Sequence, residues 1–496
     1  MDIRYRSTRG DSEQVTASQA ILKGLAKDGG LYMPETIPQL EKSLKEMASL
    51  TYQETAYEVM KLFLTDFTEE ELKGCIGRAY DEKFDTEEIA PLVKADGAYY
   101  LELFHGSTIA FKDMALSILP HLMTVSAKKN HAEHDIVILT ATSGDTGKAA
   151  MAGFADVPGT RIIVFYPKGG VSQVQELQMV TQKGDNTDVV AIHGNFDDAQ
   201  SGVKAIFGDR EFAKEVEAMG YQFSSANSIN IGRLVPQIVY YVYAYAKLLE
   251  NGEIQEGEQI NVTVPTGNFG NILAAYFAKQ MGLPIDKLIC ASNDNKVLYD
   301  FFKTGVYDRR REFILTNSPS MDILISSNLE RLIYLSTGCD GEKTGRLMKD
   351  LAEKGMYEIT GDMKERMADF VGGFATQEEN GAEIKKVYED TGYVIDTHTG
   401  VASCVYRNYA KTTGDTKKTV IASTASPYKF SRSVVEAIEG PGNSDDEFTY
   451  IDRLNVISGV ALPQAVEEIK SAPVRHHMEC EKDGMKETVR GILSGK

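Results

Sequence analysis

The chain is 496 residues long, 42% of its residues are hydrophobic, and its formal net charge is −19. A chain of this length and composition can form two or three domains with substantial buried cores. The negative charge would repel nucleic acids and anionic membrane surfaces, so we expect neither as a partner. An anionic substrate would instead need a local pocket of positive charge.

The spacing of the cysteines indicates whether the chain binds a metal, and the N-terminal segment indicates where the protein is located. None of the five cysteines lies in a CxxC pair or at the spacing of a Cys/His metal site, so we expect reduced side chains and no bound metal. The N-terminal segment lacks the apolar core of a signal peptide, and no run of about 18 apolar residues occurs. We therefore expect a cytoplasmic protein, and the sequence leaves its oligomeric state open between monomer and homodimer.

The first 95 residues show helical patterns. Apolar residues recur at helical spacing over 52–65 and 69–80, after a turn signal at Asp28-Gly29-Gly30. We predict an N-terminal region at 1–95 and a catalytic region at 96–440. A C-terminal segment at 441–496 follows, and the stretch that leads into it has the composition of a linker or exposed loop.

The segment Phe104-His-Gly-Ser-Thr-Ile-Ala-Phe-Lys-Asp113 places a lysine beside apolar residues. A lysine that forms a Schiff base with an aldehyde has to be partly neutral, and apolar surroundings lower its pKa toward that state. Most lysines are solvated surface charges, so Lys112 alone leaves both interpretations open.

From residue 136 onward, short β-rich runs alternate with helical patterns. This alternation is typical of parallel α/β sheets with helices on both faces, and their binding sites lie in loops at the carboxyl ends of strands. The predicted strands are 136–140, 161–166, 188–192 and 260–264, and the predicted helices between them include 171–182, 199–219 and 234–250.

One such loop, Ala141-Thr-Ser-Gly-Asp-Thr-Gly147, follows a predicted strand and opens a helix near Lys148. Its backbone N–H groups, its hydroxyls and the helix N-terminus are suited to binding an anion. Gly147-Lys148 also suggests a nucleotide P-loop. That motif needs Gly at position 142 and Ser or Thr at position 149, where this chain has Thr and Ala.

Two further loops end predicted strands. Pro265-Thr-Gly-Asn-Phe-Gly-Asn271 precedes an apolar helix, and its small residues let the backbone approach a phosphate. An ordinary glycine turn explains Gly267 and Gly270 equally well. The segment Val420 to Phe430 begins as an apolar strand and contains Thr424, whose hydroxyl can also simply form a local hydrogen bond there.

In this order, the segments 104–113, 141–147, 265–271 and 420–430 resemble the threonine synthase family, and Asn317 to Arg331 is also close to the family pattern. The resemblance extends from Tyr5 to Phe430. It implies fold type II of the pyridoxal phosphate (PLP) enzymes. That fold is α/β, with two parallel-sheet lobes and an N-terminal, mainly helical region.

The resemblance also implies how the matching residues meet PLP. Lys112 holds the cofactor as a Schiff base and acts as the general base. Thr424 meets the pyridine nitrogen, where a hydroxyl leaves the ring less electron-withdrawing than a carboxylate would. Asp145 stands where many fold type II enzymes have Asn, although threonine synthases often have Asp there. It would face the cofactor or the substrate carboxylate, and its contact stays open because two carboxylates would repel each other. The residues that cradle the PLP phosphate are Gly267, Asn268, Phe269, Gly270 and Asn271.

The implied substrate is O-phospho-L-homoserine, which reacts with water to give L-threonine and phosphate. Arg233 offers the substrate phosphate a planar fork of donors. Asn230 and Thr142 add neutral hydrogen bonds, and Ser143 and Thr146 face PLP or the substrate carboxylate. We expect motion between the two lobes, because water has to be admitted late.

Two other functions stay open. A PLP-dependent phospho-lyase of the same fold would release phosphate, ammonia and a 2-oxo acid. A non-catalytic homologue would only bind phosphate ligands, and the intact Lys112 and complete 265–271 loop both count against it. At Asp396-Thr-His-Thr-Gly400 the family commonly has proline after the acid, so the local turn can differ here, and we assign His398 no catalytic role.

Overall fold

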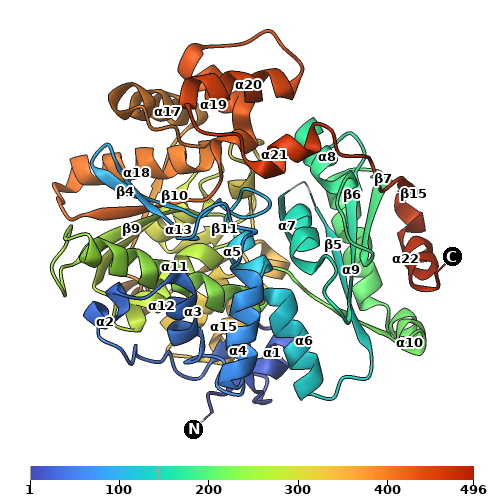
Figure 1. Ribbon diagram of the computed structural model, residues 1–496. Coiled ribbons are helices and arrows are strands. Elements are labelled where there is room, and N and C mark those ends of the chain that lie inside the picture. The colour runs from blue at the N-terminus through green and yellow to red at the C-terminus, as the bar shows by residue number, and fades with distance from the viewer. Residues whose placement is uncertain (1, 143–144, 496) are drawn as a thin grey trace.

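The computed structural model describes residues 2–142 and 145–495 of the chain. Two large sheets, each covered by helices, form two lobes that lie side by side (Figure 1). This arrangement confirms the predicted α/β fold with two lobes. None of the helices in the described part of the chain combines the length and hydropathy that crossing a bilayer requires.

The first lobe contains a six-stranded sheet in the order β13-β10-β9-β14-β4-β3. Its strands are parallel except for the β3–β4 hairpin, which crosses the predicted boundary at residue 95. The strands are β3 (Leu92–Ala95), β4 (Ala98–Glu102), β9 (Ile260–Pro265), β10 (Ile285–Ser292), β13 (Phe370–Phe374) and β14 (Thr419–Ser423). Every residue of β9 and β14 is buried, as expected for strands covered on both faces.

The second lobe contains a five-stranded, fully parallel sheet in the order β15-β7-β6-β5-β8. Three of these strands confirm the apolar runs predicted from the sequence. The strands are β5 (Asp135–Ala141), β6 (Thr160–Pro167), β7 (Thr187–His193), β8 (Tyr221–Ser224) and β15 (Met478–Glu481).

The N-terminal region packs beneath the first lobe against the long helix α11 (Ile231–Glu250), most of which is buried. Thr and Ser N-caps start all four of its helices, each as a capping box. The elements are β1 (Tyr5–Ser7), α1 (Ala17–Lys23), β2 (Tyr32–Pro34), α2 (Leu44–Ala48), α3 (Tyr52–Met60) and α4 (Glu69–Ala79).

Other helices cover the sheets or connect the lobes. Those of the first lobe are α12 (Gly270–Gln280), α13 (Val297–Thr304), α14 (Leu329–Ser336), α15 (Gly341–Lys354), α16 (Gly361–Arg366), α17 (Gln377–Thr391), α18 (Thr397–Thr413), α19 (Ser431–Glu439) and α20 (Glu447–Ser458), with a small hairpin of β11 (Val306–Asp308) and β12 (Met356–Glu358). The rest are α5 (Asp113–Leu116), α6 (Leu119–Lys129), α7 (Asp145–Phe154), α8 (Gln173–Val180), α9 (Phe196–Gly208), α10 (Arg210–Ala218), α21 (Gln464–Ile469) and α22 (Met485–Leu493).

The continuous helix predicted at 199–219 was wrong, because the chain forms α9 and α10 with a break at Asp209. The Asp209 side chain accepts hydrogen bonds from the backbone N–H groups of Glu211 and Phe212. Asp is favoured as an N-cap, where its carboxylate satisfies such donors, so a new helix starts here.

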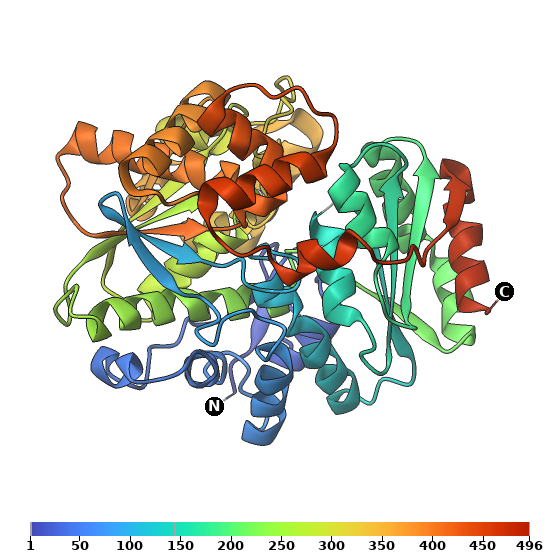
Figure 2. The same cartoon turned by 45° about the horizontal axis from the view of Figure 1, so that its top comes forward.

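The C-terminal segment joins the two lobes. After α20 on the first lobe, the chain passes through α21 to the second lobe, where β15 pairs with β7 and α22 packs on α9 (Figure 2, red). Four apolar side chains of this segment are buried in the second-lobe core: Met485, Val489, Ile492 and Leu493.

Candidate active site

Lys112 lies at the start of α5, in the connection that follows β4. Two backbone hydrogen bonds hold this connection against the end of β14, from Phe111 N–H to the Thr424 carbonyl (2.8 Å) and from Ser426 N–H to the Ile109 carbonyl (3.0 Å). Because strand-like pairing fixes both segments, Lys112 is held close to Thr424, which is itself buried.

The backbone next to Lys112 is strained. Ile109 has a φ of +53°, which is unfavourable for a β-branched residue. Neighbouring contacts maintain it: buried Asp113 accepts hydrogen bonds from the Thr108 N–H (2.7 Å) and hydroxyl (2.6 Å). Burial raises the pKa of the Asp113 carboxyl, and the hydrogen bonds from Thr108 oppose this shift. The lysine loop is therefore held in one conformation.

The predicted cofactor loop connects β9 to α12. Phe269 is the N-cap of α12, with a left-handed φ of +65° and no side-chain cap on the described N-terminus. A Cβ added at Gly267 would lie 2.4 Å from the Ser320 carbonyl oxygen. Only glycine fits there, and the first N–H groups of α12 receive no hydrogen bond from a capping side chain, as an anion site would require.

Asn271 supplies a test of whether this loop fits a phosphate. Its Oδ1 accepts hydrogen bonds from the Tyr240 hydroxyl (2.7 Å) and the Tyr241 hydroxyl, which fixes the amide orientation. Its Nδ2 is buried and has no hydrogen-bond partner within the described residues. A buried donor without an acceptor is costly, so an oxygen-rich ligand such as the PLP phosphate fits this position.

The 141–147 loop ends at α7. The Thr142 hydroxyl accepts a hydrogen bond from the Gly147 N–H (3.0 Å), so Thr142 stabilises the start of this helix. Thr146 is half-buried on the first turn. Ser143 lies outside the described residues, as does the side chain of Asp145, the residue at which α7 begins.

Asn230 and Arg233 lie at the start of α11, and both are buried. Asn230 is the N-cap, and its side chain already bonds the Ile21 carbonyl (2.9 Å), the Ser225 carbonyl (3.0 Å) and the Gly232 N–H (2.9 Å). Arg233 donates to the Ala226 carbonyl (3.2 Å), and its Nε has no partner in the described structure. Burial lowers the pKa of its guanidinium to about 10, so an anion would be stabilised beside it.

The first turns of α11, which carry Arg233 and Gln237, pack beside the cofactor loop. Gln237, one turn after Arg233, has its amide nitrogen 3.8 Å from the position of a Cβ at Gly270 and donates to the Arg233 carbonyl (2.6 Å). The first turns of α11 and the 265–271 loop therefore lie in contact.

Family models match the chain in two parts. Residues 4–80 match the threonine synthase N terminus, and residues 85–425 match the pyridoxal-phosphate dependent enzyme family. The second match covers more than half of the chain. The chain belongs to the threonine synthase family. It is therefore a PLP-dependent lyase of fold type II.

Individual relatives agree with this placement. Threonine synthase of Saccharomyces cerevisiae is 37% identical over 88% of this chain and 90% of its own length. Human threonine synthase-like 1 is 39% identical over 85% of this chain and 58% of its own length. The structure of PLP-bound threonine synthase from Brucella melitensis has 34% identity and a TM-score of 0.87, over 98% of this chain and 99% of that one.

Three residues of the family-like segment 317–331 contact the site and were not singled out from the sequence. The Ser320 hydroxyl lies 3.4 Å from Lys112 Nζ, and the Ser326 hydroxyl donates to the Gly267 carbonyl (2.6 Å). Asn328 donates to the Asn268 carbonyl through its backbone (3.0 Å) and its side chain (3.1 Å). The likeness of this whole segment to the threonine synthase pattern was the only available signal.

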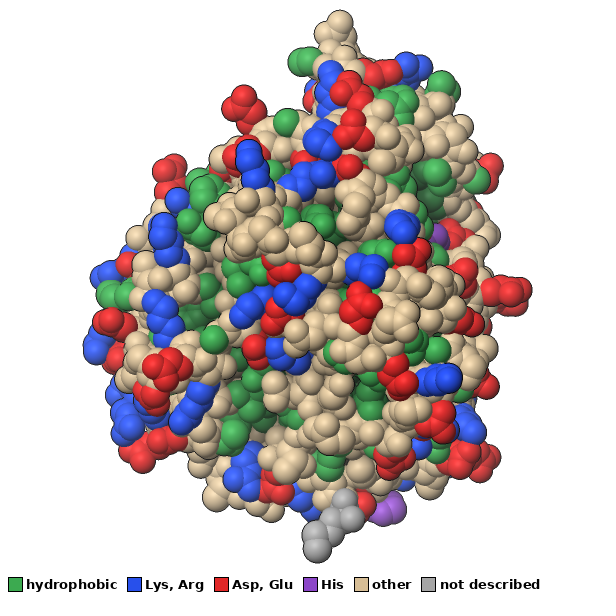
Figure 3. Space-filling model, turned by 90° about the vertical axis from the view of Figure 1, so that its left-hand side faces the viewer, with side chains coloured by type: hydrophobic (Ala, Val, Ile, Leu, Met, Phe, Trp, Pro, Cys, Tyr) green, Lys and Arg blue, Asp and Glu red, His purple; other side chains and the backbone are tan. Residues whose placement is uncertain are grey.

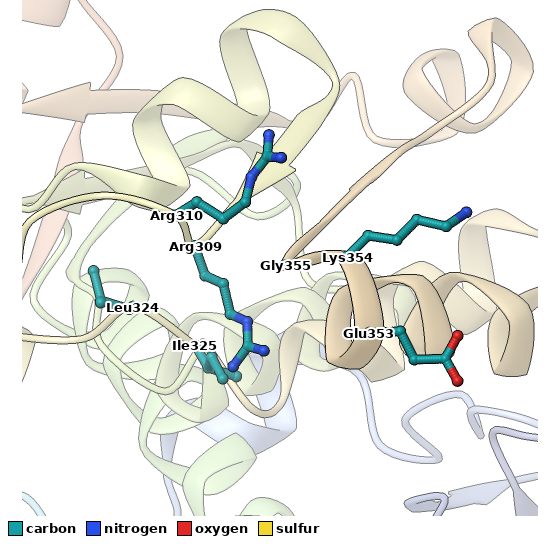
Figure 4. Close-up of a pocket in the computed structure, with 7 residues that line it drawn as sticks. All are labelled: Arg309, Arg310, Leu324, Ile325, Glu353, Lys354 and Gly355. Carbon is teal, nitrogen blue, oxygen red and sulfur yellow. The ribbon is translucent and has the colours of Figure 1, made fainter.

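A surface cavity of about 490 Å³ lies elsewhere on the first lobe (Figure 4). Arg309, Arg310 and Lys354 line it together with Leu324 and Ile325. None of its lining residues belongs to the predicted site.

The acidic and basic side chains on the face drawn in Figure 3 are interspersed, so that face presents no continuous positive surface for a polyanion.

Proposed function

We propose that this threonine synthase family member converts O-phospho-L-homoserine and water into L-threonine and phosphate. The observation that carries the proposal is that Ser320 contacts both Lys112 and the cofactor loop. Its hydroxyl lies 3.4 Å from Lys112 Nζ, and its carbonyl oxygen packs against Gly267. An amine beside a phosphate cradle is the arrangement that PLP chemistry requires.

The protein would hold PLP through both ends of the molecule. Lys112 binds it covalently, and the N-terminus of α12 with the Asn271 amide binds its phosphate. The backbone of Gly267, Asn268, Phe269 and Gly270 completes the cradle. We assign Thr424 to the pyridine nitrogen and Asp145 to the cofactor from the start of α7.

When bound, PLP withdraws electrons from the α carbon of the substrate. The Lys112 amine takes and returns protons at the α and β carbons. Its chain neighbours Ile109 and Ala110 are buried, and the amine has to be neutral when it acts as a base. Phosphate leaves from the γ carbon, and water adds at the β carbon.

The substrate phosphate would bind Arg233, whose buried charge an anion would stabilise. Thr142 and Thr146 would provide hydroxyls from the start of α7, and Ser143 is assigned the same role from the sequence alone. Because the Asn230 amide is already engaged in three hydrogen bonds, we propose that it acts mainly by fixing the start of α11 and thereby Arg233.

The division into an N-terminal region at 1–95, a two-lobed catalytic region at 96–440 and a C-terminal segment at 441–496 remains our prediction. So do a cytoplasmic location and closure of the lobes around the substrate. Closure would exclude water from the site until it is needed at the β carbon.

The test is to incubate the purified protein with PLP and O-phospho-L-homoserine and to identify the organic product and phosphate together. We expect threonine and phosphate in equal amounts. A 2-oxo acid with ammonia would identify the phospho-lyase instead, and release of neither product would favour a binding protein without catalysis.

A further inference from the structure

A buried Asp–His pair lies behind the lysine site. Asp396 is the N-cap of α18, and one of its carboxylate oxygens lies 2.9 Å from both the backbone N–H and the Nδ1 of His398. Both side chains are almost fully buried, and the imidazole packs on the Phe430 ring with centroids 4.8 Å apart. Thr397 is the first residue of α18, a position that also suits proline, so the helix start does not depend on the family's proline.

The hydrogen bonds determine which nitrogen of His398 carries the proton. The backbone N–H of Ser320 points at Nε2 from 3.1 Å, and an N–H can only donate. Nε2 must therefore have its lone pair free, and Nδ1 must carry the hydrogen that Asp396 accepts. The pair thus holds His398 as the neutral Nδ1–H tautomer.

The carboxylate is itself fixed. Its other oxygen accepts hydrogen bonds from the Thr399 backbone (3.1 Å) and hydroxyl, and that hydroxyl lies 3.1 Å from the Ser423 hydroxyl at the end of β14. The Asp–His pair is consequently tied to the same strand end that holds the lysine loop.

Ser320 is held from three directions. Its N–H is bound by His398, its carbonyl oxygen lies against Gly267, and its hydroxyl lies 3.4 Å from Lys112 Nζ. It belongs to a single turn of 3₁₀ helix, Pro319–Met321, that links the cofactor loop to the lysine.

We propose that Ser320 is a catalytic residue whose hydroxyl contacts the reacting amine, and that Asp396 and His398 are positioning residues that set its place. This inference rests on the proposed function of Lys112. A hydroxyl both accepts and donates, so it can bind Lys112 as an ammonium and as a neutral amine. The same contact therefore serves both protonation states through which a base passes.

The tautomer can be measured in the protein without cofactor. The protein contains eight histidines, so selective ¹⁵N-histidine labelling and long-range ¹H–¹⁵N NMR can resolve each ring. His398 is assigned as the ring missing from His398→Gln. We expect a protonated Nδ1 and a bare Nε2, and a protonated Nε2 on His398 would overturn the inference.

The contact with Lys112 can be measured through its reactivity. The protein without cofactor is treated with acetic anhydride, and acetylation of Lys112 is followed by peptide mass spectrometry relative to exposed Lys94. The hydroxyl binds the charged ammonium more strongly than the neutral amine, so Ser320→Ala should raise the neutral fraction, and we expect Lys112 to react roughly three- to tenfold faster. Ser320→Thr, which keeps the hydroxyl, should stay close to the wild-type rate.

Two His398 variants distinguish the hydrogen bond to Ser320 from simple filling of the space. Gln can place an oxygen near the position of Nε2, so His398→Gln should leave the Lys112 rate within about twofold of wild type. His398→Phe fills the space without an acceptor and should behave like Ser320→Ala. In the contrast variant Ser326→Ala, the lost hydroxyl contacts Gly267 and not Lys112, so PLP retention should weaken while the Lys112 rate stays unchanged.

Failure of this inference differs from failure of the proposed function. If borohydride traps PLP on Lys112 but Ser320→Ala reacts like wild type, the role of Ser320 is wrong and the function stands. If PLP is trapped on another lysine, the proposed function of Lys112 fails, whatever the protein without cofactor shows.

Discussion

At the scale of single residues, we assign the chemistry to Lys112. Lys112→Ala should leave the fold intact and lower kcat by at least about 10²–10⁴-fold, the range for losing a positioned proton-transfer group, with further loss from the missing covalent link to PLP. Borohydride reduction of the wild-type protein followed by peptide mapping locates the modified lysine. Near-normal turnover by Lys112→Ala would show that the base lies elsewhere.

We propose that Arg233 binds the substrate phosphate and not the cofactor phosphate. Arg233→Ala should lower kcat/KM roughly 10- to 150-fold, since a charge-assisted hydrogen bond contributes about 1.5–3 kcal/mol, while PLP stays bound. Arg233→Lys should restore only part of the loss, because an ammonium lacks the planar fork. Steady-state kinetics beside a PLP absorbance titration distinguish the two sites. Loss of PLP without a change in KM would mean that Arg233 serves the cofactor.

The sequence predicted some site residues and not others for a physical reason. Lys112 has apolar neighbours in the same short segment, so part of its environment could be predicted from the sequence. Ser320 contacts Lys112 from 208 positions away, and such a contact depends on the fold. Asn230 is the opposite case. The resemblance implied a substrate contact, which stays a prediction, and the structure shows that its side chain caps α11 and donates to the Ile21 carbonyl of the N-terminal region.

At the scale of elements, the cofactor loop depends on the absence of a side chain at Gly267. Gly267→Val would push against the Ser320 carbonyl and displace the cradle, so PLP affinity should fall about tenfold or more. Gly77→Val is the matched control, because a Cβ there meets nothing within 4 Å. A PLP titration of both variants is the measurement, and equal PLP affinity in the two would remove the phosphate from this loop.

The C-terminal element should stabilise the second lobe. Met485 is buried against α9, whereas Met478 on β15 is 37% exposed. Met485→Ala should lower the free energy of unfolding by about 2–5 kcal/mol, and Met478→Ala should change it little. Urea unfolding curves of the two variants provide the comparison. A similar small effect in both would show that α22 contributes little to this core.

Elements with long apolar runs were predictable, and their ends and partners were not. The strands at 136–140, 161–166 and 188–192 lie in the buried sheet as expected, because only continuous apolar runs suit strands covered on both faces. The break at Asp209 was missed because apolar spacing continues across it, and β15 was missed because its pairing with β7 is set by tertiary structure.

At the scale of the whole molecule, we propose that the site lies between the two lobes. Lys112 and Thr424 are held by the first lobe, and β5, whose end at Ala141 leads into the 141–147 segment, belongs to the second. The C-terminal chain crosses between the lobes through α21 (Figure 2). Composition and alternation predicted two lobes, but nothing in the sequence indicated that residues after 440 would connect them.

The most direct test of the proposed reaction is to run it in H₂¹⁸O. If phosphate leaves by cleavage of the bond between the γ carbon and oxygen and water then adds at the β carbon, the threonine hydroxyl gains one ¹⁸O and the phosphate gains none. Mass spectrometry of both products reads this directly, with inorganic phosphate incubated alone as the control for exchange. The account predicts labelled threonine and unlabelled phosphate, and ¹⁸O in the phosphate with unlabelled homoserine as the product would contradict it.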